Sequence, residues 1–79
     1  MAVILLAGTH GTDDPTRASI PFHMAVGAIE AGHQPQIVLM GDASYVIQEG
    51  VVQHIQGVGM PALSELLQTV RRHEVPIYV

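Results

Sequence analysis

The sequence predicts an α/β fold built on a parallel three-strand sheet. Three short apolar runs lie at residues 2–7, 36–40 and 75–79, and each is continuous rather than alternating. Continuous apolar strands are typical of a parallel sheet that is covered on both faces. Two segments with apolar residues at helical spacing separate the runs, and this alternation indicates βαβ units. A chain of 79 residues has room for one domain, so we expect a single α/β domain over residues 1–79.

The first strand is expected over Ala2 to Ala7 and ends at Gly8. The run has no basic residue before it and is too short to cross a bilayer. Turn-forming residues follow at once, from Gly8 to Asp14. We therefore interpret the run as a buried strand rather than as a leader or a membrane span.

The first helix is predicted to follow this turn. Asp13 or Asp14 is suited to cap its N-terminus, and Pro15 is suited to the first helical position. Its buried stripe consists of Ala18, Phe22, Ala25, Val26 and Ile29. Pro21 lies in the second turn and is expected to kink the helix or loosen its first turn. Gly32 is a natural C-cap.

The second strand, over Gln36 to Met40, ends at Gly41. A short helix is predicted over Ala43 to Glu49, because Asp42 is a suitable N-cap for it and Gly50 a suitable end. This helix leads into the second half of the chain.

Residues 51–55 fit either a short strand or an extended connector. The last helix is predicted from Pro61 to about His73, with complementary charges at its two ends. Its apolar stripe consists of Leu63, Leu66, Leu67 and Val70. The third strand is expected over Val75 to Val79. Pro76 lacks an N–H and therefore belongs at the start of that strand or at a sheet edge.

Right-handed crossovers in the order β-α-β-α-α-β predict a flavodoxin-like, three-layer parallel sheet with the strand order 2-1-3. The third strand then forms an uncovered edge, so the sheet is expected to be incomplete at its C-terminal edge. Ligands of such sheets bind beyond the carboxyl ends of the strands, where the winding reverses, which here lies between strands one and three. The expected ligand-binding crevice contains Gly8, Thr9, His10, Gly11, Gly41 and Asp42.

Three polar residues at or near this crevice could take part in chemistry or binding. His10 could act as an acid or base, because histidine changes charge near neutral pH. A lone loop histidine is rarely sufficient, so the simpler interpretation is that His10 satisfies backbone groups of its loop. Asp42 could orient a ligand or a neighbouring histidine, although an N-cap role explains it more simply. Tyr45 could hydrogen-bond at an interface or line a pocket, and we identify no catalytic residue.

The composition disfavours several ligand classes. The net charge is -4, with three arginines and no lysine, which argues against nucleic acid and against an anionic membrane surface. The segment from Gly8 to Thr12 has neither the G-x-G-x-x-G spacing nor the Walker lysine of a nucleotide site. The five histidines include no His-x-x-x-His pair, and there is no cysteine. We therefore expect neither a metal nor another cofactor.

The composition also bears on compartment and assembly. A chain without cysteine has no disulfide framework, which fits a cytoplasmic location. Hydrophobic residues make up 48% of the chain and charged residues only 13%. So much apolar surface on so short a chain predicts that it assembles with further copies of itself.

Six stretches of the sequence together resemble a known family. They are His10–Ala18, Pro21–Phe22, Ala31–His33, Ile37–Ala43, Gly57–Leu63 and Ile77–Val79. In this order the set resembles the DsrE/DsrF-like family of small sulfur-relay proteins. The resemblance implies a flavodoxin-like fold and assembly into trimers or hexamers. For some members it also implies a cysteine that carries persulfide sulfur between partner proteins.

In many members of that family, a cysteine directly follows the strand that resembles Ile77–Val79. The present sequence ends at Val79 and contains no cysteine, so it is either a fragment or a shortened member. One hypothesis is a sulfur-relay protein, at most a sulfurtransferase-like carrier, whose reactive thiol lies beyond Val79 and which acts on sulfur-relay partner proteins. The alternative is a non-catalytic oligomeric module that binds a small ligand or a partner.

Overall fold

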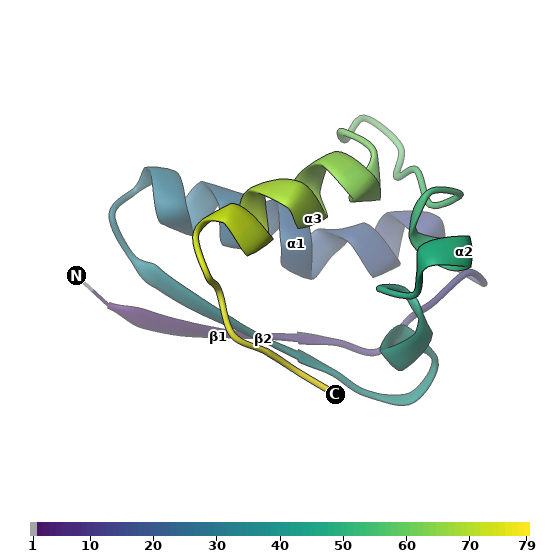
Figure 1. Ribbon diagram of the computed structural model, residues 1–79, viewed down its shortest axis with the longest axis horizontal. Helices are drawn as coiled ribbons and strands as arrows, with labels where there is room; N and C mark the ends of the chain where they lie inside the picture. The colour runs from purple at the N-terminus through teal and green to yellow at the C-terminus, as the bar shows by residue number, and fades with distance from the viewer. Residues whose placement is uncertain (1) are drawn as a thin grey trace.

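Three parallel strands and two long helices form the framework of the molecule (Figure 1). The computed structural model describes residues 2–79, apart from the side chain of Glu49, and Met1 of the expected domain lies outside them. The elements in chain order are β1 (Val3–Gly8), α1 (Pro15–Glu30), β2 (Gln34–Leu39), the 3-10 helix η1 (Gly41–Tyr45), α2 (Glu49–Val52), α3 (Leu63–Arg72) and β3 (Ile77–Tyr78). The predicted α/β class and the three parallel strands are confirmed.

Strand β2 lies at the centre of the sheet, whose strand order is β1-β2-β3. Strands β1 and β2 pair along their whole length, from Val3 opposite Gln34 to Gly8 opposite Leu39. Strand β3 pairs with β2 through only two residues. The predicted order 2-1-3 is therefore wrong.

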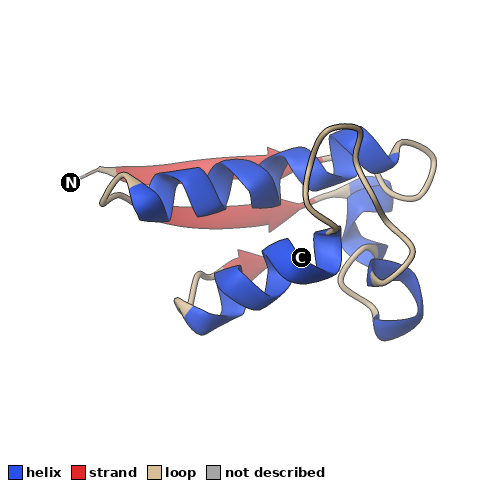
Figure 2. Ribbon diagram, turned by 90° about the horizontal axis from the view of Figure 1, so that it is seen from above, coloured by secondary structure: helices blue, strands red, loops and turns tan. Residues whose placement is uncertain are grey.

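Both long helices cover the same face of the sheet (Figure 1, Figure 2). Two crossovers of the same hand that step in the same direction put their helices on one side, whereas the order 2-1-3 would put them on opposite sides. Residues 2–79 therefore form two layers instead of the predicted three. One face of the sheet is packed against helices, and the other is open.

Helix α1 begins and ends close to where its sequence predicts. The Asp14 carboxylate accepts a backbone N–H of the first turn at 3.1 Å, so Asp14 is the N-cap and Pro15 the first helical residue. At the other end, Gly32 follows the C-cap with a φ of 84°. The N–H of His33 then donates to the Ala28 carbonyl at 2.8 Å, which completes a Schellman motif.

The apolar stripe of α1 faces the core, as predicted, but it lies slightly to one side of the expected one. Ala18, Phe22 and Ala25 are buried, whereas Val26 and Ile29 are only half-buried. Pro21 and Ala28 are buried in their place, so the buried stripe continues to the last turn of the helix.

The segment between β2 and α3 departs most from the prediction. Asp42 is not an N-cap, because it lies inside η1, whose N-cap is Met40 and has no side-chain capping bond. Helix α2 begins at Glu49, where the predicted helix was expected to end, and takes up the first two of residues 51–55. The apolar run there is too short for its periodicity to distinguish helix from strand.

Helix α3 begins at Leu63, two residues after the expected start at Pro61. Its predicted stripe is confirmed, since four residues are buried: Leu63, Leu66, Leu67 and Val70. A second Schellman motif ends the helix. Glu74 has a φ of 56°, and the Val75 N–H donates to the Val70 carbonyl at 3.1 Å.

The core lies between the covered sheet face and the two long helices. Its largest fully buried side chains come from α1, β2, α3 and the loops at one end of the sheet. They include Phe22, Ile37, Leu39, Val46, Ile55, Leu63 and Val70. The side chain of Leu6 joins them from β1 and is 8% exposed.

The other sheet face carries apolar side chains that no helix of residues 2–79 covers. We call it the open sheet face and define it by Val3, Leu5, Ala7, Val38 and Tyr78. Val3 and Leu5 are each 63% exposed, and Tyr78 is 53% exposed. Because side chains alternate along a strand, Leu6, Ile37 and Leu39 are buried in the core while their neighbours along the strands face the open side.

Candidate functional site

The loops that follow β1 and β2 lie against each other at one edge of the sheet. The strands end together, and the Met40 N–H donates to the Gly8 carbonyl at 2.9 Å. The tightest approach is between Gly11 and Asp42. A Cβ atom on Gly11 would lie 2.5 Å from the Asp42 carbonyl oxygen, so only glycine fits there. The predicted crevice residues are thus neighbours, although the expected reversal of winding between strands one and three is absent because β2 separates those strands.

Gly8 has a packing role. It is buried, and a Cβ there would lie 3.0 Å from Pro21 Cγ and 3.3 Å from Leu39 Cδ2. The close approach lets α1 pack on the end of β1, and the helix continues through Pro21 as one element. Gly41 has a backbone role, since its φ of 58° is one that glycine adopts without strain.

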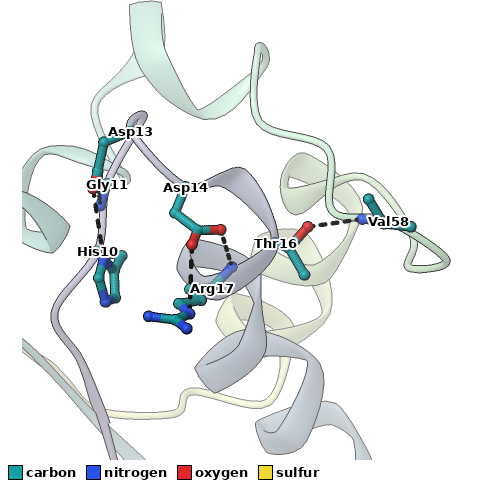
Figure 3. Close-up of polar contacts among 7 residues, drawn as sticks. All are labelled: His10, Gly11, Asp13, Asp14, Thr16, Arg17 and Val58. Carbon is teal, nitrogen blue, oxygen red and sulfur yellow. Dashed lines mark hydrogen bonds and ion pairs between the residues drawn. The ribbon is translucent and has the colours of Figure 1, made fainter.

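His10 and Asp13 form a small polar pair in the β1–α1 loop (Figure 3). The backbone N–H of Gly11 donates to Asp13 Oδ1 at 3.0 Å, and Asp13 Oδ2 lies 3.5 Å from His10 Nδ1. The Gly11 hydrogen bond is the main cause that lowers the pKa of Asp13, and His10 adds to it. The pair thus connects the His10 ring to a side chain of its own loop rather than to the backbone groups that the simpler interpretation expected.

Asp13 was considered from the sequence only as a possible helix cap. Because Asp14 takes that role, the Asp13 side chain does not cap the helix and folds back toward Gly11 instead. Two successive aspartates before Pro15, of which only one can cap the helix, are the signal that could have found this pair.

The N-terminus of α1 is held by two further side-chain contacts (Figure 3). Asp14 Oδ2 lies 3.4 Å from Arg17 Nε. The Thr16 hydroxyl oxygen accepts the Val58 N–H at 3.1 Å, so the loop before α3 is joined to the start of α1. The Asp14 carboxylate and the Arg17 guanidinium thus form an ion pair with each other.

A pocket of about 280 Å³ opens beside these loops. Its lining consists of Thr12, Asp13, Asp42, Tyr45, Val46 and Val51. Of the predicted crevice residues, only Asp42 lines it. Tyr45 lies three residues after Asp42 in η1 and lines the pocket, which is one of the two roles considered for it.

The chemistry of this pocket is acidic. Two carboxylates line it, and none of its lining residues is lysine, arginine or histidine. An anion would meet repulsion there, so the pocket is better suited to neutral or cationic groups that donate hydrogen bonds. Val46 and Val51 add an apolar wall.

A second pocket, of about 330 Å³, lies at the opposite end of the sheet. It is formed by the two turns that enter β2 and β3, and its lining consists of His33, Gln34, Pro35, Gln36, His73, Glu74, Val75 and Pro76. No sequence motif predicts this pocket, because its residues belong to the connections that enter the two strands.

Two further properties of residues 2–79 concern metals and membranes. Among the side chains that the structure describes, no group of three or more His, Cys, Asp or Glu lies close enough together to hold a metal ion. Among the helices of the described chain, none combines the length and apolar character needed to cross a bilayer.

Comparison with known proteins places the chain in a family. Neither the curated proteins nor the solved structures include a match to this sequence. A model of the DsrE/DsrF-like family matches residues 2–79, which is almost the whole chain. The chain therefore belongs to the DsrE/DsrF-like family.

Proposed function

We propose that this chain is the scaffold of a sulfur-relay protein, in which a thiol at the carboxyl end of β3 carries persulfide sulfur. The family match over residues 2–79 is the observation that carries the proposal. The register of the sheet supports its location. Tyr78 lies opposite Val38, so a residue that followed Val79 would lie level with Met40, next to the loops of the candidate site.

The reaction requires only sulfur exchange between thiols. A thiolate attacks the outer sulfur of a donor persulfide, the S–S bond of the donor breaks, and the donor leaves as a thiolate. The outer sulfur is then carried as a persulfide on the attacking cysteine. The exchange has no net oxidation or reduction, so it needs no redox cofactor.

The thiol itself must come from outside residues 1–79, because these contain no cysteine. It can be supplied by residues that follow Val79 or by a partner protein. We favour the former because the family resemblance puts the carrier cysteine directly after the strand that corresponds to β3. Exchange of this kind needs reduced thiols, so we also propose a cytoplasmic location.

Charge at the site bears on how the thiol works. Asp13 and Asp42 line the neighbouring pocket, and their negative charge disfavours an anionic persulfide inside it. We therefore propose that the carried sulfur faces a partner protein rather than the pocket. Sulfur-relay partner proteins are then the expected binding partners.

The test is mass spectrometry of the protein expressed from its native reading frame. The protein is incubated with glutathione persulfide, alkylated and analysed intact and as peptides. We expect one added sulfur atom on a cysteine that follows β3, and loss of that sulfur when an acceptor thiol is added. Residues 1–79 expressed alone are the matched control and should gain no sulfur. A native protein that has a cysteine after β3 but never carries sulfur would contradict the proposal, as would a reading frame without one.

A second candidate is a non-catalytic module that assembles with itself and binds a ligand or partner. The open sheet face favours it, because Val3 and Leu5 are each 63% exposed. Trimers or hexamers are the assemblies that we expect. The substitution Leu5→Lys should weaken assembly in sedimentation experiments, whereas Gln68→Lys, on the exposed side of α3, should not. A wild-type protein that is a stable folded monomer at micromolar concentration would contradict self-assembly.

A further inference from the structure

The first strand is fastened at its start by the turn that connects α1 to β2. The Ala2 carbonyl accepts the Gln34 N–H at 2.8 Å. The Ala2 nitrogen in turn donates to Nδ1 of the His33 side chain at 3.0 Å. Residue 2 is therefore held on both sides, once by the backbone and once by a histidine ring.

The backbone of His33 is itself well placed. It directly follows Gly32, and its N–H closes the Schellman motif of α1 through the Ala28 carbonyl. The ring is half-buried and lines the pocket at the amino ends of β2 and β3. The position of His33 Nδ1 is thus set by the end of a long helix that belongs to the core.

The contact between Ala2 and His33 depends on the charge of the ring. A backbone nitrogen can only donate here, so Nδ1 must be the acceptor and must carry no proton. The neutral ring therefore has its proton on Nε2. When the ring takes up a second proton, Nδ1 becomes a donor and faces another donor, so the hydrogen bond is lost.

The other histidine of this pocket behaves in the opposite way. His73 Nδ1 lies 3.0 Å from the Thr69 carbonyl oxygen, which can only accept. Nδ1 of His73 therefore carries a proton in both the neutral and the charged ring. Protonation of His73 leaves its own contact in place, which makes His73 a natural control for His33.

We propose that His33 anchors the start of β1 through a hydrogen bond that depends on pH. With the ring neutral, Ala2 is held by two hydrogen bonds, and with the ring charged it is held by one. The contact exists at the higher pH and is lost as the pH falls through the range in which histidine rings in general gain a proton, about pH 8 to 5. The device acts at the opposite end of the sheet from the sulfur-relay site and does not depend on it.

Other titratable groups line the same pocket. The α3–β3 turn contributes His73 and Glu74, whereas the α1–β2 turn adds only uncharged residues besides His33.

Amide hydrogen exchange of the full chain can test whether the hydrogen bond between Ala2 and His33 depends on pH. The reporter is the Gln34 amide, whose bond to the Ala2 carbonyl depends on residue 2 staying in place. The Met40 amide, bonded to the Gly8 carbonyl at the far end of the same strand pair, is the internal reference. After correction for intrinsic exchange, the protection of Gln34 relative to Met40 should fall about two- to tenfold between pH 8 and pH 5.

Three variants separate the ring of His33 from other causes. His33→Asn keeps an acceptor oxygen that does not titrate, so protection should stay high at both pH values. His33→Leu removes the acceptor, so protection should be low at both. His73→Gln should keep the full pH dependence. A wild-type ratio that does not change with pH, a pH dependence that survives in His33→Asn, or unchanged protection in His33→Leu would each overturn the proposal.

Discussion

The two faces of the sheet differ sharply, although the same apolar runs supply both. On the covered face, Leu6 is 8% exposed and Ile37 is fully buried beneath the helices. On the open face, Leu5 is 63% exposed, one residue away along the same strand. A continuous apolar strand therefore indicates that both of its faces are apolar, but it does not indicate that both faces are covered. The covered face stabilises residues 2–79 through its buried side chains. The apolar side chains of the open face stay largely exposed, so contacts within residues 2–79 do not account for them.

The largest effect is expected from substitutions that compare these faces directly. Leu6→Ala removes buried methyl groups and should lower the free energy of unfolding by about 2–5 kcal/mol. Leu5→Ala, on the open face, should lower it by less than about 1 kcal/mol when the protein is dilute enough to be a monomer. Urea denaturation followed by circular dichroism measures both. Equal losses would show that Leu5 is buried against something in solution, and the division into two unlike faces would fail for the isolated chain.

A smaller effect is expected where the covered face has no room for a methyl group. Gly8→Ala puts a Cβ 3.0 Å from Pro21 Cγ and should cost about 1–3 kcal/mol, since helix and strand must move apart. The neighbouring Ala7 points to the open face, so Ala7→Val should change stability by about 0.5 kcal/mol or less. Thermal unfolding of the two variants gives the comparison. A neutral Gly8→Ala would mean that α1 is packed less tightly on β1 than described.

The ends of the two covering helices provide a third test. The residue after each C-cap is left-handed, with a φ of 84° at Gly32 and 56° at Glu74. Glu74→Gly should therefore raise the free energy of unfolding by about 1 kcal/mol, and Gly32→Ala should lower it by about the same amount. Chemical denaturation checks both signs. If Glu74→Gly is destabilising, α3 does not end in the Schellman geometry described here.

The smallest effect concerns the loop at the carboxyl edge of the sheet. The Gly11 N–H holds the pKa of Asp13 below its ordinary value of 3.8. A lowered pKa means that the ionised carboxylate favours the folded state, so its contribution is present above about pH 3.8 and is lost as the pH falls further. Asp13→Asn should therefore be less stable than the wild type at neutral pH. The two stabilities should become similar as the pH falls below about 3.8. Denaturation at a series of pH values measures the difference, and a pH-independent gap would rule out the carboxylate as the cause.

The sequence was sufficient for the elements that carry a strong local signal. Asp13 or Asp14 as the N-cap, followed by Pro15, predicted the start of α1, and the stripe from Leu63 to Val70 predicted the buried side of α3. These features depend on neighbouring residues, which a single sequence displays directly.

The arrangement of the sheet could not be predicted in the same way. The orders 2-1-3 and 1-2-3 need the same elements and differ only in the direction of the second crossover. The misassignment of Asp42 has a similar cause, because a 3-10 helix that starts at Gly41 places Asp42 inside the turn rather than before it. The pairing of Asp13 with His10 depended on which aspartate capped α1, and two adjacent aspartates leave that choice open in the sequence.

The central claim, that this fold presents a sulfur-carrying thiol at the carboxyl end of β3, has one direct test. It is the mass of the peptide that contains Ile77–Tyr78 and the residues that follow, taken from native protein exposed to glutathione persulfide. The account predicts one extra sulfur atom on that peptide, removable by an acceptor thiol. The same peptide without added sulfur, in protein that is otherwise folded, would contradict it.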